Sequence, residues 1–300
     1  MLADALASGK FVVTAEVGPP ADPDPEPVRE TARALANVVD AANVTDNQAA
    51  TVKLSPVTCS GWMLEEGLEP ILQLTTRDRN IMALQSELLA AWALGVGTVL
   101  ALSGDPLKVG PYDGRATAVG DVDSVGLVSL IAAMNEGRLA AGEELKTPTG
   151  FLIASAANPL VDRIERLERK LDAGVGCLQT NIVYDVERFA EWFAPIVDAG
   201  VADRAAILVG VMPPRSVRAL EFMHERIPGV EVDEATFARM RGVEGDEAKA
   251  AGVEIAADVI RGVRALPGVA GVHIMAPGWP VEAVPRVVAA AALGATAAGR

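Results

Sequence analysis

Short apolar runs rich in Val, Ile and Leu recur along the chain, and longer segments with apolar residues every three or four positions lie between them. Short runs of this kind are typical of buried strands, and the longer period is typical of helices. The alternation predicts a βαβα order and a parallel sheet. The expected strands are residues 11–17, 43–45, 70–75, 98–102, 150–154, 177–180, 205–210 and 271–275.

Helices are expected at residues 27–39, 80–94, 124–135, 160–173, 185–199 and 216–225. Pro27 suits a first helical position, Asp185 a position just before a helix, and Gly174 a helix end. The acidic stretch 230–250 predicts a further helical excursion before the last strand. Eight βα units in one chain, with no linker-like tract, predict an α/β fold, a single-domain (βα)8 TIM barrel over residues 1–300, with an open doubly wound sheet as the alternative.

Composition narrows the class of partner. Half of the residues are hydrophobic, only 4% are aromatic, and the formal net charge is −14. Such a charge repels phosphate backbones and anionic lipid, so we expect no nucleic-acid or membrane partner. Cys59 and Cys177 lie far apart without metal-ligand spacing, and no apolar run is long enough to cross a membrane. These features favour a soluble, cytoplasmic protein.

Active sites of such barrels lie at the carboxyl ends of the strands, so polar residues at those positions are the candidates. Glu16 interrupts an apolar run just before a Gly-Pro-Pro turn, and a desolvated carboxyl there could act as a general acid. An ion pair across the barrel is the alternative. Asp105 follows the run 98–102, where Gly104 allows close backbone approach, although an Asp here could also simply form a turn. The patternless segment 105–122 is expected to be a functional loop.

Several blocks carry a family resemblance. They are A-E-V-G-P-P around Glu16, R-D-R-N followed by the S-G-D that ends at Asp105, and A-G-V-G-C-L-Q-T-N-I-V-Y-D over residues 173–185. In this order, over nearly the full chain, they resemble the methylenetetrahydrofolate reductase family in its short form without a regulatory domain.

The resemblance implies reduction of 5,10-methylenetetrahydrofolate to 5-methyltetrahydrofolate, or the reverse, with NADH or NADPH as hydride donor and FAD as carrier. Glu16 would be the general acid, Asp105 would bond the pterin, and Gln179 or Asn181 would bind the folate's polar edge. Hydride transfer without a flavin is an alternative, as is a folate- or flavin-binding subunit that depends on an accessory electron-transfer partner. A homo-oligomer is also compatible with the resemblance.

For the cofactor, the resemblance implies contacts from Thr45, Asp46, Gln73, Ser103, Gly104, Asp121, Asn158, Arg166, Arg169 and Lys170. Spacing adds that Arg166 shares a helix face with either Arg169 or Lys170, so that two cations could hold one diphosphate. A solvated charge ladder is the alternative. At four positions the flavin pattern changes, because Asp46-Asn47, Gln73, Ser103 and Asn158 replace Tyr-Gly, His, Arg and His. His224 and His273 are not spaced as metal ligands, so we expect no metal, and His273 is expected to be a satisfied core residue.

Overall fold

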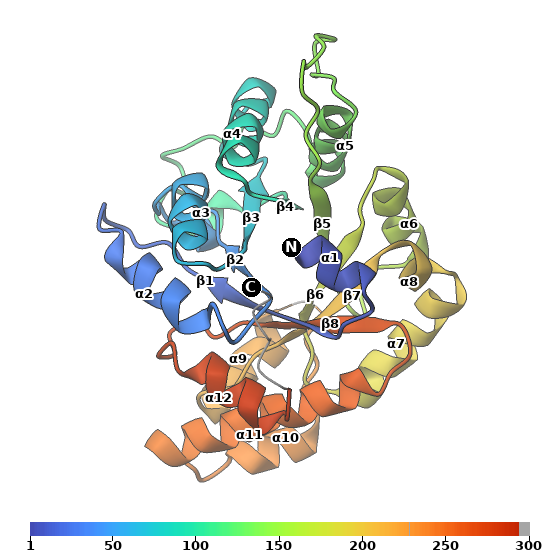
Figure 1. Ribbon diagram of the computed structural model, residues 1–300. Helices are drawn as coiled ribbons and strands as arrows, with labels where there is room; N and C mark the ends of the chain where they lie inside the picture. Colours follow the sequence, from blue (N-terminus) through green and yellow to red (C-terminus); the bar gives the residue numbers. More distant parts are fainter. Residues whose placement is uncertain (228, 294–300) are drawn as a thin grey trace.

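Eight parallel strands form a closed barrel in the computed structural model, which describes residues 1–227 and 229–293. Each strand pairs with the next, and β8 pairs with β1, which excludes the open sheet (Figure 1). The predicted TIM barrel is therefore confirmed. The strands are β1 (Val12–Val17), β2 (Ala41–Val44), β3 (Pro70–Thr75), β4 (Thr98–Leu102), β5 (Leu152–Ala157), β6 (Cys177–Ile182), β7 (Ala206–Val211) and β8 (Val269–Ile274).

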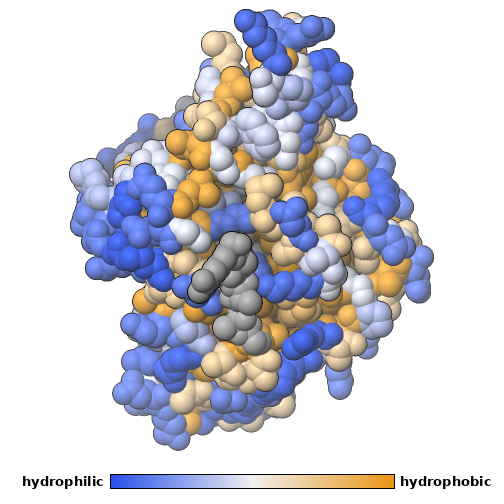
Figure 2. All heavy atoms as spheres, in the orientation of Figure 1, coloured by the Kyte–Doolittle hydropathy of each residue, from blue (hydrophilic) through white to orange (hydrophobic). Residues whose placement is uncertain are grey.

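Helices surround the barrel, and their outer surfaces are mainly hydrophilic over α2, α3, α10 and α11 (Figure 2). Among the described residues, no helix is long and apolar enough to cross a membrane. The helices are α1 (Leu2–Ala7), α2 (Glu26–Leu35), α3 (Pro56–Glu65), α4 (Ile81–Leu94), α5 (Ser124–Asn135), α6 (Ile164–Asp172), α7 (Val186–Asp198), α8 (Val201–Arg204), α9 (Val217–Arg226), α10 (Glu234–Met240), α11 (Gly245–Arg264) and α12 (Ala283–Ala290), with 3-10 turns η1 (Gln48–Ala50) and η2 (Leu107–Val109).

The barrel interior is apolar at one end and polar at the other. Residues two apart on a strand point the same way, so the inward side chains form layers. The lowest layer takes one residue from each of β1 to β7, and Leu2 of α1 packs against it. Its members are Val12, Ala41, Ile71, Leu100, Ala154, Cys177 and Leu208. Because α1 covers this end, the opposite end is the one left for a ligand.

Every expected strand and helix exists, with shifted ends; β2 begins at Ala41 rather than at residue 43, and β5 ends at Ala157 rather than at residue 154. Helix α6 begins at Ile164 rather than at residue 160, because Leu160 is left-handed, with φ of 64°. The prediction for α2 was too long at its end, since the helix stops at Leu35. The excursion in 230–250 is α10 together with the start of α11, and α3 was not predicted. The segment 105–122 contains only η2.

Candidate active site

A layer of buried polar side chains lies directly above the apolar layer. Asn43 and Gln179 exchange two amide hydrogen bonds, with N···O distances of 2.8 and 3.1 Å. The ring of His273 contacts Thr14 Oγ1 through Nδ1 at 3.0 Å and Asn43 Nδ2 through Nε2 at 3.4 Å. Burial lowers the pKa of His273 to about 4, so the ring is neutral at pH 7. His273 is thus the satisfied core residue that the sequence predicts, and the layer holds the Gln179 amide in place.

Glu16 lies one layer higher, at the mouth. It is the fifth residue of β1, in register with Asn43 of β2. Removal from water raises the pKa of its carboxyl to about 7, and hydrogen bonding by the Gln48 side chain opposes that rise. No ion pair involves Glu16 within residues 1–227 and 229–293, so the alternative of an ion pair across the barrel is not what the structure has. A carboxyl in this state can both hold and release a proton at neutral pH.

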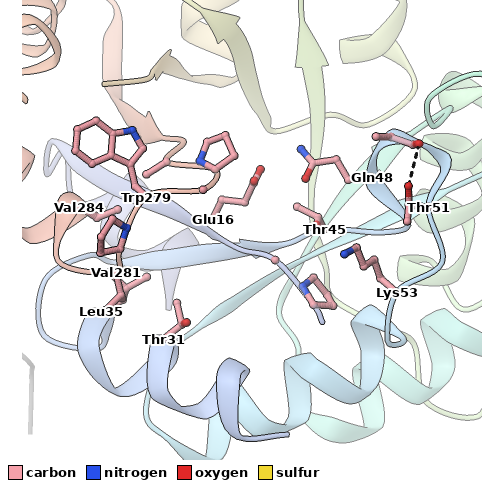
Figure 3. A pocket seen from close by; sticks show the side chains of 17 residues that line it. Glu16, Thr31, Leu35, Thr45, Gln48, Thr51, Lys53, Trp279, Val281 and Val284 are labelled. Carbon is pink, nitrogen blue, oxygen red and sulfur yellow. Dashed lines mark hydrogen bonds between the residues drawn. The ribbon is translucent and has the colours of Figure 1, made fainter. Parts of the chain in front are cut away.

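Adjoining cavities open at this end of the barrel. The β1–β8 cavity, of about 530 Å³, lies between the segments that follow β1, β2 and β8 (Figure 3). The β3–β5 cavity, of about 380 Å³, lies over the ends of those strands, and the central cavity, of about 370 Å³, lies over the polar layer. Glu16 lines the β1–β8 and central cavities, and Gln48 lines all three. Glu16 therefore lies where two binding spaces meet.

The cavities bring together most of the residues that the sequence nominated. The central cavity is lined by Glu16, Gln73, Asn158, Arg166, Lys170, Gln179 and Asn181. The β3–β5 cavity is lined by Asp46, Gln73, Ser103, Gly104, Asp105, Arg166 and Lys170, and Thr45 lines the β1–β8 cavity.

Two of the predicted cofactor residues, Asp121 and Arg169, do not line these three cavities. Asp121 accepts a hydrogen bond from the backbone of Ile81 at the start of α4, at 3.2 Å. Arg169 is exposed on α6 and is not among the residues that line these three cavities in the described part of the chain. Glu16, Asp105 and Asn181 share one end of the barrel, although Asp105 lines a different cavity from the other two.

A strained turn places Gln48, which sequence reasoning missed. Asn47, Ala49 and Ala50 are left-handed although none is glycine, with φ of 46°, 54° and 51°. Such residues cost about 1–3 kcal/mol each and persist only where the surroundings impose them. Here Asp105 Oδ2 accepts from the Ala49 backbone N–H at 2.7 Å, and Arg77 donates to the Asn47 carbonyl at 3.1 Å. Asp105 therefore holds the turn that aims Gln48 at the mouth.

Asp46 lines the β3–β5 cavity, but its carboxylate is already paired within the protein. Its buried carboxylate pairs with Arg79 at 2.7 Å and accepts from the N–H and hydroxyl of Thr75 at 2.8 and 2.9 Å. The backbone at Gly104 lies close to Thr75: φ is 83°, and an added Cβ would lie 3.1 Å from Thr75 Cβ. Only glycine fits there without strain.

Two cations of α6 face the cavities. Arg166 and Lys170, four residues apart, both line the β3–β5 and central cavities. Lys170 is 5% exposed, donates to the Ala156 carbonyl and lies 4.0 Å from Asp162, and burial lowers its pKa. Arg166 is 57% exposed and lies 3.3 Å from the same carboxylate. The pair on one face is thus Arg166 with Lys170, and Arg169 is not part of it.

Residues 1–278 match the family model for methylenetetrahydrofolate reductase. The chain belongs to the methylenetetrahydrofolate reductase family. The matched part includes all eight strands and every nominated residue. Membership in the methylenetetrahydrofolate reductase family supports an oxidoreductase that acts on a folate.

A solved structure shows the same fold. An uncharacterized protein from Clostridium thermocellum that binds two copies of 5-methyl-5,6,7,8-tetrahydrofolic acid aligns over 97% of this chain and 98% of its own, with a TM-score of 0.68 and 12% identity. A 2,3-dimethylmalate lyase is more distant, with a TM-score of 0.48, 11% identity, and coverage of 91% of this chain and 79% of its own. No curated protein sequence matches the chain significantly.

Proposed function

We propose that the chain reduces 5,10-methylenetetrahydrofolate to 5-methyltetrahydrofolate with hydride from NADH or NADPH, and that Glu16 is the general acid. The observation that carries the proposal is the Glu16 carboxyl, which lies without an ion pair among the described residues where two cavities meet and has a pKa of about 7. Family membership and the folate named for the Clostridium protein support the substrate class.

The chemistry requires one proton and one hydride. The methylene carbon bridges two nitrogens, and one C–N bond must break before hydride can add. Glu16 would give its proton to the leaving nitrogen, which takes the electron pair of the broken bond, and the resulting iminium carbon would accept the hydride. Gln179, held by Asn43, and Asn181 would bind the polar edge of the pterin in the central cavity.

The donor set on α6 fits one diphosphate. Arg166 and Lys170 face the same space, and the backbone at Gly104 borders it. They would hold FAD, which, when bound, accepts hydride from the nicotinamide and passes it to the folate. Asp105 holds the turn that carries Gln48 and also lines the β3–β5 cavity. It would therefore lie beside the ring system of the bound flavin.

A second candidate is direct transfer from the nicotinamide to the folate without a flavin. The β3–β5 cavity offers two α6 cations beside the Asp105 carboxylate, and both cations already lie within 4.0 Å of Asp162, which suits one diphosphate better than two. Absorbance of the purified chain and anaerobic NADH oxidation with methylenetetrahydrofolate, with and without added FAD, separate the two routes. Folate-dependent oxidation without any flavin favours the second. No oxidation in either case favours a subunit that needs an electron-transfer partner.

Substituting Glu16→Gln tests the acid. Gln keeps the size and hydrogen-bonding capacity of the side chain but cannot supply the proton. Folate reduction should fall by about 10²–10⁴-fold, whereas binding of the nicotinamide nucleotide, followed by its fluorescence, should not change. The wild-type rate should decline as pH rises through about 7, because the acid form is then lost, and this decline should disappear in the variant. A variant that reduces folate at the wild-type rate would remove Glu16 from the mechanism.

A further inference from the structure

Helices α4 and α5 lie next to each other on the outside of the barrel and carry almost no charge (Figure 1). Glu87 is the one charged residue of α4, and α5 has none, although charged residues make up 22% of the chain. A helix on the surface of a barrel normally turns a charged or polar face to solvent. The outer faces of these two helices therefore need a reason other than contact with water.

The outer face of α4 is an exposed apolar stripe. Its members recur every three or four positions, which places them on one side of the helix. They are Met82, Ser86, Leu89, Ala90, Ala93 and Leu94. Met82 is 76% exposed and Leu94 51%, whereas Glu87 lies about 100° round the helix from Ser86, at the edge of the stripe. In Figure 2 the surface near α4 is largely orange, tan and white, in contrast to the blue surface over α10 and α11. Exposed apolar patches of this kind mark sites of protein association.

A hairpin beside the stripe forms a fixed ridge. The chain after α5 turns back on itself, closed by an antiparallel bridge between Arg138 and Glu144, and projects outward past α5 (Figure 1). The hairpin is tied to α4, because the Ala140 N–H donates to Gln85 Oε1 at 2.8 Å and the same amide donates to the Ile81 carbonyl at 3.1 Å. Stripe and hairpin thus form one rigid surface, which would lose little conformational freedom on binding a partner.

The charges on the hairpin indicate which partner fits. Arg138 and Lys146 are basic, and Glu143 and Glu144 are acidic, and all four are exposed. Lys146, Glu143 and Glu144 take part in no ion pair among the described residues. A surface that has an apolar centre and both signs of charge is complementary to itself, as a two-fold interface between identical chains requires. A basic partner would instead be attracted to the rest of the surface, since the chain has a net charge of −14.

The size of this surface also agrees with a contact between two copies. Helix α4 has 14 residues and α5 has 12, so that their joint outer face measures roughly 20 Å by 20 Å. A standard interface buries about 800 Å² on each partner, so the hairpin has to take part as well. Copies with the same net charge repel each other through their other faces, which favours contact through this nearly uncharged one.

We propose that the α4 stripe, the outer face of α5 and the hairpin bind the same surface of a second copy of this chain, in a two-fold dimer. In the described part of the chain, the stripe and the hairpin contribute no residue to the three cavities at the mouth. The inference therefore does not depend on the proposed function.

Sedimentation velocity of the full chain over a wide range of concentration tests the dimer, which should dissociate on dilution. Ala90→Glu introduces a charge into the stripe and should weaken dimerisation by at least about tenfold, because that charge would be buried without a partner. Ala90→Lys should weaken it as well, although it lowers the net negative charge and would strengthen an association limited only by repulsion. Ala34→Glu, at an exposed position of α2, is the matched control and should have no effect.

None of these variants should lose helix content in circular dichroism, because Ala, Glu and Lys are all good helix formers. A wild type that sediments as a monomer at every concentration would overturn the inference. So would a dimer that persists unchanged in both Ala90 variants, or an equal loss of dimer in Ala34→Glu, which would indicate a general effect of charge.

Discussion

At the scale of single residues, two opposing effects set the state of Glu16. Burial raises the pKa of its carboxyl, and Gln48 lowers it, with a result of about 7. The charged and titratable groups that share its cavities are Lys53 on one side and Asp162, Arg166, Lys170 and His273 on the other. A carboxyl balanced in this way is sensitive to one neighbouring amide.

Replacing that amide in Gln48→Leu should raise the pKa of Glu16 further, because a hydrogen bond that favours the charged form is lost. The decline of activity at high pH should move upward by the same amount. Titration of the carboxyl by NMR in the ligand-free protein measures the shift directly. Gln73→Leu, another amide at the mouth, is the control and should leave the pKa of Glu16 unchanged. An unshifted pKa in Gln48→Leu would show that Gln48 does not act on the acid.

The sequence could reveal Glu16, Gln179 and Asn181 because each is a polar residue in or next to an apolar strand. It could not reveal Gln48. The position of that side chain depends on a left-handed turn that Asp105 holds from 56 residues away, and the turn contains no glycine that would signal it. The same contact gives Asp105 a structural role that the sequence did not predict, since it supports this turn as well as lining the β3–β5 cavity.

At the scale of elements, strands were easier to predict than helices. A strand buried on both faces is an apolar run, whereas a helix needs a regular apolar stripe to be recognised. Helix α3 shows no clear apolar stripe in its sequence, because its buried face includes the polar Ser60, whereas the apolar Trp62 and Leu64 lie outside the buried set. The helix also begins at a proline, Pro56. The predicted start of α6 at Leu160 was too early, because Leu160 is left-handed and a left-handed residue cannot belong to a right-handed helix.

The face of α6 makes a prediction that separates neighbouring arginines. Arg166→Ala should weaken binding of the dinucleotide by about tenfold, because Arg166 faces the cavities, whereas Arg169→Ala, on the exposed side of the same helix, should not change it. Titration of NADPH or FAD fluorescence measures both. Both substitutions remove one exposed arginine from one helix, so each controls for the other. Equal losses would favour a general charge effect and the ladder interpretation.

At the scale of the whole molecule, the barrel is closed at one end and open at the other. The apolar layer and α1 seal the lower end, and the polar layer of Asn43, Gln179 and His273 lies between this seal and the mouth. Leu2 is 1% exposed, and its backbone N–H donates to Glu69 at 2.7 Å. The apolar packing that closes the barrel and the cavities at its mouth therefore lie at opposite ends of the barrel.

Leu2→Ala tests this separation, and with it the expectation that residues 1–300 are one domain. Loss of a buried Leu leaves a cavity beneath seven strands and should lower the free energy of unfolding by about 2–5 kcal/mol. Because closure links all eight strands, the wild type and the variant should each unfold in one denaturant transition with the same slope, followed by circular dichroism and by tryptophan fluorescence. Binding of NADPH in the absence of denaturant, followed by its fluorescence, should not change, since the substitution lies at the far end from the mouth. A separate early transition in the variant, or a loss of NADPH affinity equal to that of Arg166→Ala, would show that the two ends are not independent in this way.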